Sequence, residues 1–112
     1  MELEKKKCIP CEGGIPPLTE DEILEYISVV RGWIARDNKK ITKAFQFVNF
    51  KHTMAFVNEV ARIAEEEGHH PVMHIGYGNA EVELWTHAID GLSENDFILA
   101  AKIDQLPVQL RS

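Results

Sequence analysis

The segment from residue 67 to residue 71 constrains the fold most strongly, because it must end a helix. Gly68 suits the left-handed conformation that commonly follows a helix, and Pro71 cannot continue one. Apolar residues before this exit recur at helical spacing and predict a helix over residues 51–67, with this buried stripe: Met54, Val57, Val60, Ala61 and Ala64. His69 and His70 are therefore expected just beyond the C-terminal end of that helix.

The chain before this helix predicts a shorter helix and then a hairpin. Thr19 and Glu22 have the spacing of a capping box, in which each side chain satisfies a free backbone amide of the first turn, and they predict a helix over residues 20–30. Residues 33–36 and 41–48 follow as two strands around a short polar turn.

A second hairpin is predicted after the helix exit. Residues 72–77 and 80–87 have strand-like patterns, and the dipeptide Gly78-Asn79 between them is typical of a tight turn. A regular register around that turn places His70 opposite His87, whereas a bulge would shift the pairing by one residue. The same register gives these facing pairs: Met73 with Leu84, His74 with Glu83, and Val72 with Trp85.

The last periodic segment predicts a helix that is apolar on more than one side. Ser93 and Asp96 resemble a capping box and start a helix that continues to about Leu106. Its apolar residues are Phe97, Ile98, Leu99, Ala100, Ala101 and Ile103. Such a helix in a small domain must cover one side elsewhere, so we expect a self-associating surface.

Taken in order, these segments predict an α+β domain with the order α-β-β-α-β-β-α. Two hairpins and three helices are expected to form a four-stranded antiparallel sheet with the helices on one face. The chain has 112 residues, which is enough for one domain with a modest core. We place that domain at residues 19–112, after a flexible N-terminal extension at residues 1–18.

The extension contains the only two cysteines, Cys8 and Cys11, in a stretch rich in Gly and Pro. Two thiols at this spacing can be half of a zinc site, a redox pair, or a feature without chemistry. A full zinc site needs four ligands, and a redox pair normally opens a helix after a strand. An inert or accessory segment is therefore the favoured interpretation.

Charge and hydropathy exclude several classes of function. The formal net charge of −6 argues against nucleic-acid binding, which depends on clustered Lys and Arg. No apolar stretch approaches the roughly 20 residues that span a bilayer, and the N-terminus lacks the apolar segment of a secretory signal. We therefore expect no nucleic-acid partner, no membrane association and a cytoplasmic location.

The histidines suggest either a metal site or proton transfer. His70 and His74 have a spacing typical of zinc ligands on a helix, but on a strand they lie about 13 Å apart, too far for one ion. His69, His70 and His87 remain a less favoured set of metal ligands. Imidazole can donate or accept a proton near neutral pH, so three histidines beside the carboxylates Glu65 and Asp96 favour acid-base chemistry.

The same residues resemble the signature of the pterin-4a-carbinolamine dehydratase family. The resemblance covers Thr19 to about Leu106 and includes these positions: Glu65, His69, His70, Pro71, Tyr77, His87, the run Gly91-Leu92-Ser93, and Asp96. It implies a hydro-lyase that dehydrates 4a-hydroxytetrahydrobiopterin to quinonoid dihydropterin, in tetrahydrobiopterin recycling. No metal and no cofactor are implied. The family's last helix serves oligomerisation, which implies a homodimer or homotetramer.

The resemblance also implies roles for individual residues. His69, His70 and His87 are the catalytic candidates, with His69 and His87 as acid and base in either order and His70 orienting the substrate. Glu65 is expected to raise histidine basicity or hold the amino groups of the pterin, and Asp96 to support His87. The substrate-binding candidates are Glu65, Pro71, Trp85, Thr86 and Asp96.

Other functions stay open on the sequence alone. Relatives often have an aromatic residue just after the His-His-Pro segment, where this chain has Met73, so a different pterin is an alternative. The cysteine-containing extension is absent from shorter relatives, and a molybdopterin-related role or a metal-binding role is a further alternative. Animal members also bind a transcription factor, so the third alternative is a non-catalytic dimerisation or binding module.

Overall fold

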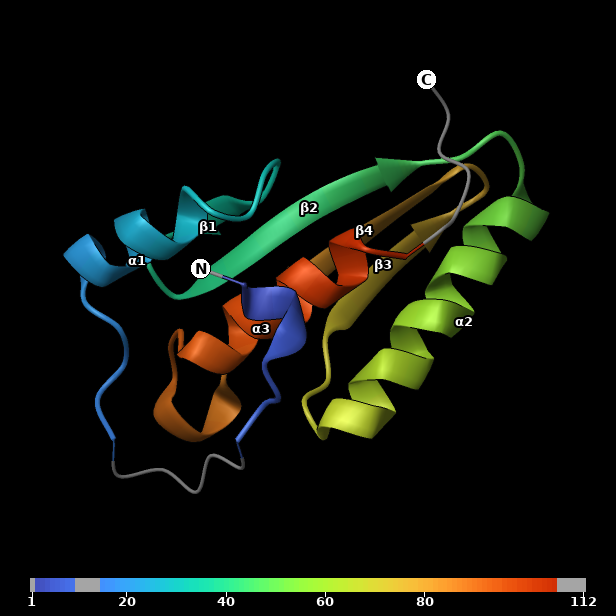
Figure 1. The fold of residues 1–112 in the computed structure, drawn as a ribbon. Coiled ribbons are helices and arrows are strands. Elements are labelled where there is room, and N and C mark those ends of the chain that lie inside the picture. Colours follow the sequence, from blue (N-terminus) through green and yellow to red (C-terminus); the bar gives the residue numbers. More distant parts are fainter. Residues whose placement is uncertain (1, 10–14, 107–112) are drawn as a thin grey trace.

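The computed structural model describes residues 2–9 and 15–106 and confirms the predicted α+β fold (Figure 1). Its elements are a 3-10 turn η1 (Leu3–Lys5), α1 (Glu20–Ile27), β1 (Ile34–Arg36), β2 (Lys40–Gln46), α2 (Phe50–Glu67), β3 (Val72–Gly76), β4 (Asn79–Leu84), a 3-10 turn η2 (His87–Ile89) and α3 (Glu94–Asp104). The four strands form one antiparallel sheet in the order β1-β2-β4-β3, and the three helices cover one of its faces. Among the helices of the described ranges, none has both the length and the apolar character needed to cross a membrane.

The helix ends largely follow the predicted caps. Thr19 and Glu22 form the capping box of α1, although the helix ends three residues earlier than predicted, at Ile27. Gly68 ends α2 with φ of +66°, in the left-handed region that favours glycine. The chain can therefore leave the helix sharply, which places His69 and His70 between α2 and β3.

The buried face of α2 is rotated relative to the predicted stripe. Val57, Val60 and Ala64 are buried as predicted, but Ala61 is exposed and Met54 only half-buried. The remaining buried positions of the helix are Thr53, Phe56 and Ile63. Packing between aromatic rings favours this orientation of the helix. The Phe56 ring lies 4.5 Å from the Phe45 ring and 5.2 Å from the Phe47 ring.

The predicted register of the second hairpin is wrong by two residues. Met73 faces Val82 and His74 faces Glu81, so the turn lies at Tyr77-Gly78 rather than at Gly78-Asn79. A glycine suits position 78 because two backbone segments approach each other closely there, and not because φ is positive. The Gly78 carbonyl accepts a hydrogen bond from Phe47 N at 2.8 Å, and a Cβ at Gly78 would lie 2.8 Å from the Phe47 carbonyl oxygen. A shift of two keeps every side chain on its predicted face but removes the expected pairing of His70 with His87.

Helix α3 is buried on nearly all sides within a single chain. Asn95 to Ala101 and Ile103 are all buried, because α3 lies between the sheet, α2 and the N-terminal segment (Figure 1). The N-terminal residues 2–9, drawn in dark blue, cover one side of this helix. The burial of this helix is therefore explained within one chain, and self-association stays a prediction.

The described part of the expected extension contributes to the core. Leu3 is fully buried in the same cluster as Phe97 and Ile98, and Lys102 Nζ donates to the Glu4 carbonyl at 2.9 Å. A domain boundary at residue 18 would leave these contacts outside the domain. We therefore propose that residues 2–9 belong to the folded unit.

Replacing Leu3 with Ala should lower the free energy of unfolding by about 2 to 3 kcal/mol, because it leaves a cavity beneath α3. Urea denaturation measures this change. Ile15→Ala is a matched control in the same N-terminal region, since Ile15 is 56% exposed and should change stability by less than about 0.5 kcal/mol. Equal, small effects of both substitutions would contradict the assignment of Leu3 to the core.

Candidate active site

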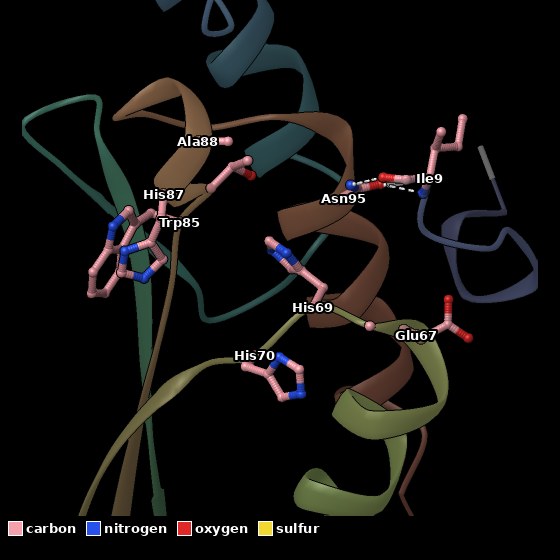
Figure 2. Close-up of a pocket in the computed structure, with 10 residues that line it drawn as sticks. Ile9, Glu67, His69, His70, Trp85, His87, Ala88 and Asn95 are labelled. Atoms are coloured by element: carbon pink, nitrogen blue, oxygen red, sulfur yellow. Dashed lines mark hydrogen bonds between the residues drawn. The ribbon is translucent and has the colours of Figure 1, made fainter. Parts of the chain in front are cut away.

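A pocket of about 250 Å³ lies where α2, β4 and α3 meet (Figure 2). It is lined by Ile9, Glu67, Gly68, His69, His70, Trp85, Thr86, His87, Ala88 and Asn95. The three histidines of the predicted site are thus brought together, although not by the predicted strand pairing. This volume lies just below the roughly 300 to 1,000 Å³ that is usual for small-molecule sites.

His69 is the most firmly held of these histidines. Its side chain is 12% exposed, and its Nε2 lies 2.6 Å from Oδ1 of Asp96. An ionised carboxylate can only accept a hydrogen bond, so Nε2 carries the donated proton. The other ring nitrogen, Nδ1, is then the one available to a ligand in the pocket.

Asp96 is fully buried and orders several groups around His69. Its Oδ2 accepts hydrogen bonds from Thr86 Oγ1 at 2.8 Å and from Ser93 N at 2.9 Å. Since the single hydroxyl proton of Thr86 goes to Asp96, the Ser93 hydroxyl donates to Thr86 Oγ1 at 2.7 Å. Asp96 therefore supports His69 rather than His87, which corrects the predicted partner. It does not line the pocket itself.

His87 and Trp85 form one side of the pocket. Strand β4 ends at Leu84, and His87 begins η2, so the exposed imidazole is placed by a turn rather than by a strand. The His87 ring lies 4.3 Å from the Trp85 ring, and Lys40 Nζ lies 5.0 Å from the same indole. Thr86, between them, is 3% exposed and anchors this segment through its bond to Asp96.

His70 and Glu65 form a looser pair at the edge of the site. The His70 Nε2 and Glu65 Oε1 atoms are 3.6 Å apart, and the two side chains are 59% and 80% exposed. Glu65 and Pro71 were predicted to bind substrate, but neither lines the pocket. Pro71 follows the end of α2 at Glu67. A solvent-exposed contact of this kind orients His70 only weakly.

Two other predicted features lie away from the pocket. Tyr77 is 70% exposed in the turn at the opposite end of the hairpin. His74 is on the uncovered face of the sheet, where its Nε2 lies 2.8 Å from Glu83 Oε2. Within the described residues, the ligand atoms of His74, Glu81 and Glu83 come within 4.8 Å of one another, but none of these residues lines the pocket.

Five residues that line the pocket were not predicted as site residues: Ile9, Glu67, Gly68, Ala88 and Asn95. Glu67 and Asn95 hold the N-terminal segment beside the site. Cys8 N donates to Glu67 Oε1 at 2.8 Å, and Ile9 N donates to Asn95 Oδ1 at 2.9 Å. No periodic pattern in residues 1–18 signals this contact, although the polar Asn95 within an apolar helix is an irregularity that could have drawn attention.

The surroundings of Cys8 disfavour ionisation of its thiol. Burial raises the pKa of its thiol from 9.0 to about 12, and the nearby Glu67 carboxylate adds to the shift. Metal ligation and thiol exchange both use the thiolate, so Cys8 as placed here is suited to neither. Cys11 lies outside the described residues.

Alkylation by iodoacetamide should therefore be slow at Cys8 in the folded protein. In a Cys11→Ser background, the reaction at pH 8 should be at least 10-fold slower in buffer than in urea, because the folded thiol ionises only near its pKa of about 12. The pKa of the Cys8 thiol is higher in the folded protein than in the unfolded chain, so the protonated thiol favours folding. Its contribution to the free energy of unfolding is complete below pH 9 and is progressively lost between pH 9 and 12. Equal alkylation rates in both solvents would contradict the buried position.

Comparisons with known proteins agree on one family. A family model described as pterin 4 alpha carbinolamine dehydratase matches residues 16–106. Relatives from Rubrobacter xylanophilus and Nitrosospira multiformis carry the name "Putative pterin-4-alpha-carbinolamine dehydratase". The first is 45% identical over 94% of this chain and 98% of the relative, and the second is 52% identical over 94% and 92%.

Two solved structures have a similar fold. One, titled a transcriptional coactivator/pterin dehydratase from Brucella melitensis, has a TM-score of 0.75 and 34% identity over 79% of this chain and 95% of its own. The other, a pterin dehydratase-like protein identified as a RuBisCO assembly factor in the alpha-carboxysome, has a TM-score of 0.57 and 25% identity over 66% of this chain and 87% of its own.

Proposed function

Because the chain belongs to the pterin 4 alpha carbinolamine dehydratase family, we propose that it dehydrates a 4a-hydroxytetrahydropterin by acid-base catalysis. The observation that carries this proposal is the meeting of His69, His70 and His87 in one pocket. The expected substrate is 4a-hydroxytetrahydrobiopterin, and the product is quinonoid dihydropterin. This reaction would serve tetrahydrobiopterin recycling.

The chemistry explains why two imidazoles are needed. Hydroxide is a poor leaving group, so an acid must give a proton to the departing 4a-hydroxyl. The electron pair of the broken C–O bond leaves with water. A neighbouring ring nitrogen loses its proton to a base, and the electrons of that N–H bond form the new C=N double bond. His69 and His87 are the two groups to which we assign these proton transfers, one donating and one accepting.

The residues that contact each histidine support different roles for the three side chains. Asp96 fixes the tautomer and orientation of His69 through its 2.6 Å contact. Trp85, whose ring lies 4.3 Å from the His87 ring at a tilt of 39°, supplies an aromatic surface for a flat ring. His70 is exposed and loosely held, and we assign it to binding and orienting the substrate rather than to a proton transfer.

A non-catalytic binding role is the second candidate, because the RuBisCO assembly factor shares the fold. The two candidates differ in a direct assay. Freshly generated 4a-hydroxytetrahydrobiopterin is mixed with the protein, and the quinonoid product is trapped by a reductase that consumes NADH. The proposal expects NADH consumption to accelerate with protein concentration, whereas a pure binding module would leave it at the rate of the buffer.

A further inference from the structure

We propose that Lys40 is a positioning residue for the pocket, because its ammonium group holds the Trp85 ring in the orientation that binds a flat substrate. The inference rests on the proposed function, since it concerns how the same pocket binds its ligand. Trp85 lines the pocket, whereas Lys40 does not, so Lys40 acts only through the ring.

The backbone of Trp85 is fixed by its neighbours, but its ring is not. Side chains alternate between the two faces of a strand, and Leu84 and Thr86, on either side of Trp85, are both buried. Thr86 donates its hydroxyl proton to Asp96 and its backbone N–H to the Gly91 carbonyl. Trp85 therefore points to the uncovered face of the sheet, where the orientation of its ring depends on what the ring touches there.

Lys40 lies beside this ring on the neighbouring strand. Ile41 of β2 pairs with Leu84 of β4, so the antiparallel register continued by one residue brings Lys40 opposite Trp85. Lys40 Nζ lies over the indole at 5.0 Å from its centroid, within the roughly 6 Å at which the face of an aromatic ring attracts a cation. Among aromatic side chains, indole is the strongest partner for such a contact.

Glu83 keeps the ammonium group at this place. Its Oε1 lies 3.4 Å from Lys40 Nζ, and the Glu83 side chain is 16% exposed. Glu83 and Trp85 are two residues apart on one chain, so they point to the same face. The carboxylate and the indole thus share one ammonium group. Because that group is partly covered, its attraction to the ring is stronger than it would be in open water.

The Trp85 ring joins this contact to a proposed catalytic group. The rings of Trp85 and His87 are 4.3 Å apart and lie together on one side of the site (Figure 2). Without the Lys40 contact, the indole gains rotational freedom, and a ligand must restrict it again on binding. Substrate binding should therefore weaken, while proton transfer should continue, since neither Lys40 nor Trp85 is assigned a proton transfer.

Three substitutions test this role with 7,8-dihydrobiopterin as a stable probe, measured by isothermal titration calorimetry. Lys40→Met removes the charge but keeps a long side chain, and it should raise Kd about 4-fold. Lys40→Arg keeps a cation that stacks on aromatic rings and should return Kd to within about 1.5-fold of wild type. Lys39→Met is the matched control, because it makes the same change of charge at the next residue, which pairs with the exposed carboxylate of Asp90.

Acrylamide quenching of tryptophan fluorescence reports on the ring without any ligand. Trp33 is 4% exposed and Trp85 is half-buried, so the quencher reaches mainly Trp85. Lys40→Met should raise the quenching constant about 2-fold, because the ring becomes more accessible once the contact is lost. Lys40→Arg and Lys39→Met should leave this constant at the wild-type value.

Steady-state dehydration separates positioning from a merely structural role. Lys40→Met should raise KM about 4-fold with kcat within about a factor of two, whereas partial unfolding would lower kcat and leave KM unchanged. Wild-type Kd and KM in Lys40→Met would overturn the inference and leave the proposed function intact. Equal rises in Kd for Lys40→Met and Lys39→Met would also overturn it, since net charge would then explain the effect. A wild-type protein that bound no pterin would overturn both.

Discussion

Replacing either His69 or His87 with Ala is expected to lower kcat for dehydration by about 100-fold or more, because in the proposed mechanism each of these histidines transfers a proton. The two losses should not multiply fully, since the acid and the base act in one concerted process. Substrate binding should weaken less than the rate falls, because Trp85 and the remaining residues of the pocket stay in place. Steady-state kinetics of both variants measures these effects.

His74→Ala is the matched control for this prediction. His74 is 59% exposed on the uncovered face of the sheet, and it does not line the pocket. Its replacement should leave kcat and KM within a factor of two of wild type. Loss of activity in His74→Ala equal to that in His69→Ala would mean that the pocket is not the site of the reaction.

Replacing Asp96 with Asn should reduce kcat about 100-fold while keeping the fold, because it reverses the hydrogen bond to His69. The oxygen at the Oδ2 position must still accept from Thr86 Oγ1 and Ser93 N. The new amide group therefore faces His69 Nε2 and donates to it, where the carboxylate accepted. His69 is then forced into the tautomer with its proton on Nδ1, the nitrogen left for the substrate.

The free energy of unfolding shows whether a loss of activity comes from the changed tautomer or from unfolding of the variant. Asp96→Asn preserves the shape of the side chain and should cost about 1 to 2 kcal/mol of unfolding free energy, whereas Asp96→Ala leaves three buried donors unpaired and should cost about 3 to 5 kcal/mol. Asp90→Asn is the matched control, because the Asp90 side chain is 83% exposed. A folded Asp96→Asn protein with wild-type kcat would contradict the role of Asp96 in positioning His69.

The fold was largely predictable because its local signals agree with one another. Thr19 with Glu22, Gly68 before Pro71, and Ser93 with Asp96 mark helix ends by chemistry that acts within a few residues. The errors occur where distant contacts decide. The hairpin turn differs from the prediction where Gly78 contacts Phe47, and the buried face of α2 differs from the prediction where the Phe56 ring packs against Phe45.

The meeting of the three histidines was predictable, but their hydrogen-bond partners were not. His69, His70 and His87 share a pocket because the helix exit and the end of β4 lie together, a result that tolerates the wrong register. The contact of Asp96 with His69 depends on how α3 packs, which no short pattern encodes. The position of residues 2–9 was missed for the same reason, since Leu3 and Ile9 are held only by contacts with a helix that comes about 90 residues later.

The most direct test of the account is a single-turnover measurement with protein in excess over 4a-hydroxytetrahydrobiopterin. The rate constant for loss of this substrate is measured in buffer, with wild-type protein, and with the folded double variant His69→Ala, His87→Ala. Acid-base catalysis in the pocket predicts a wild-type rate at least 100-fold above that of the double variant. A wild-type rate equal to that of buffer would contradict the account.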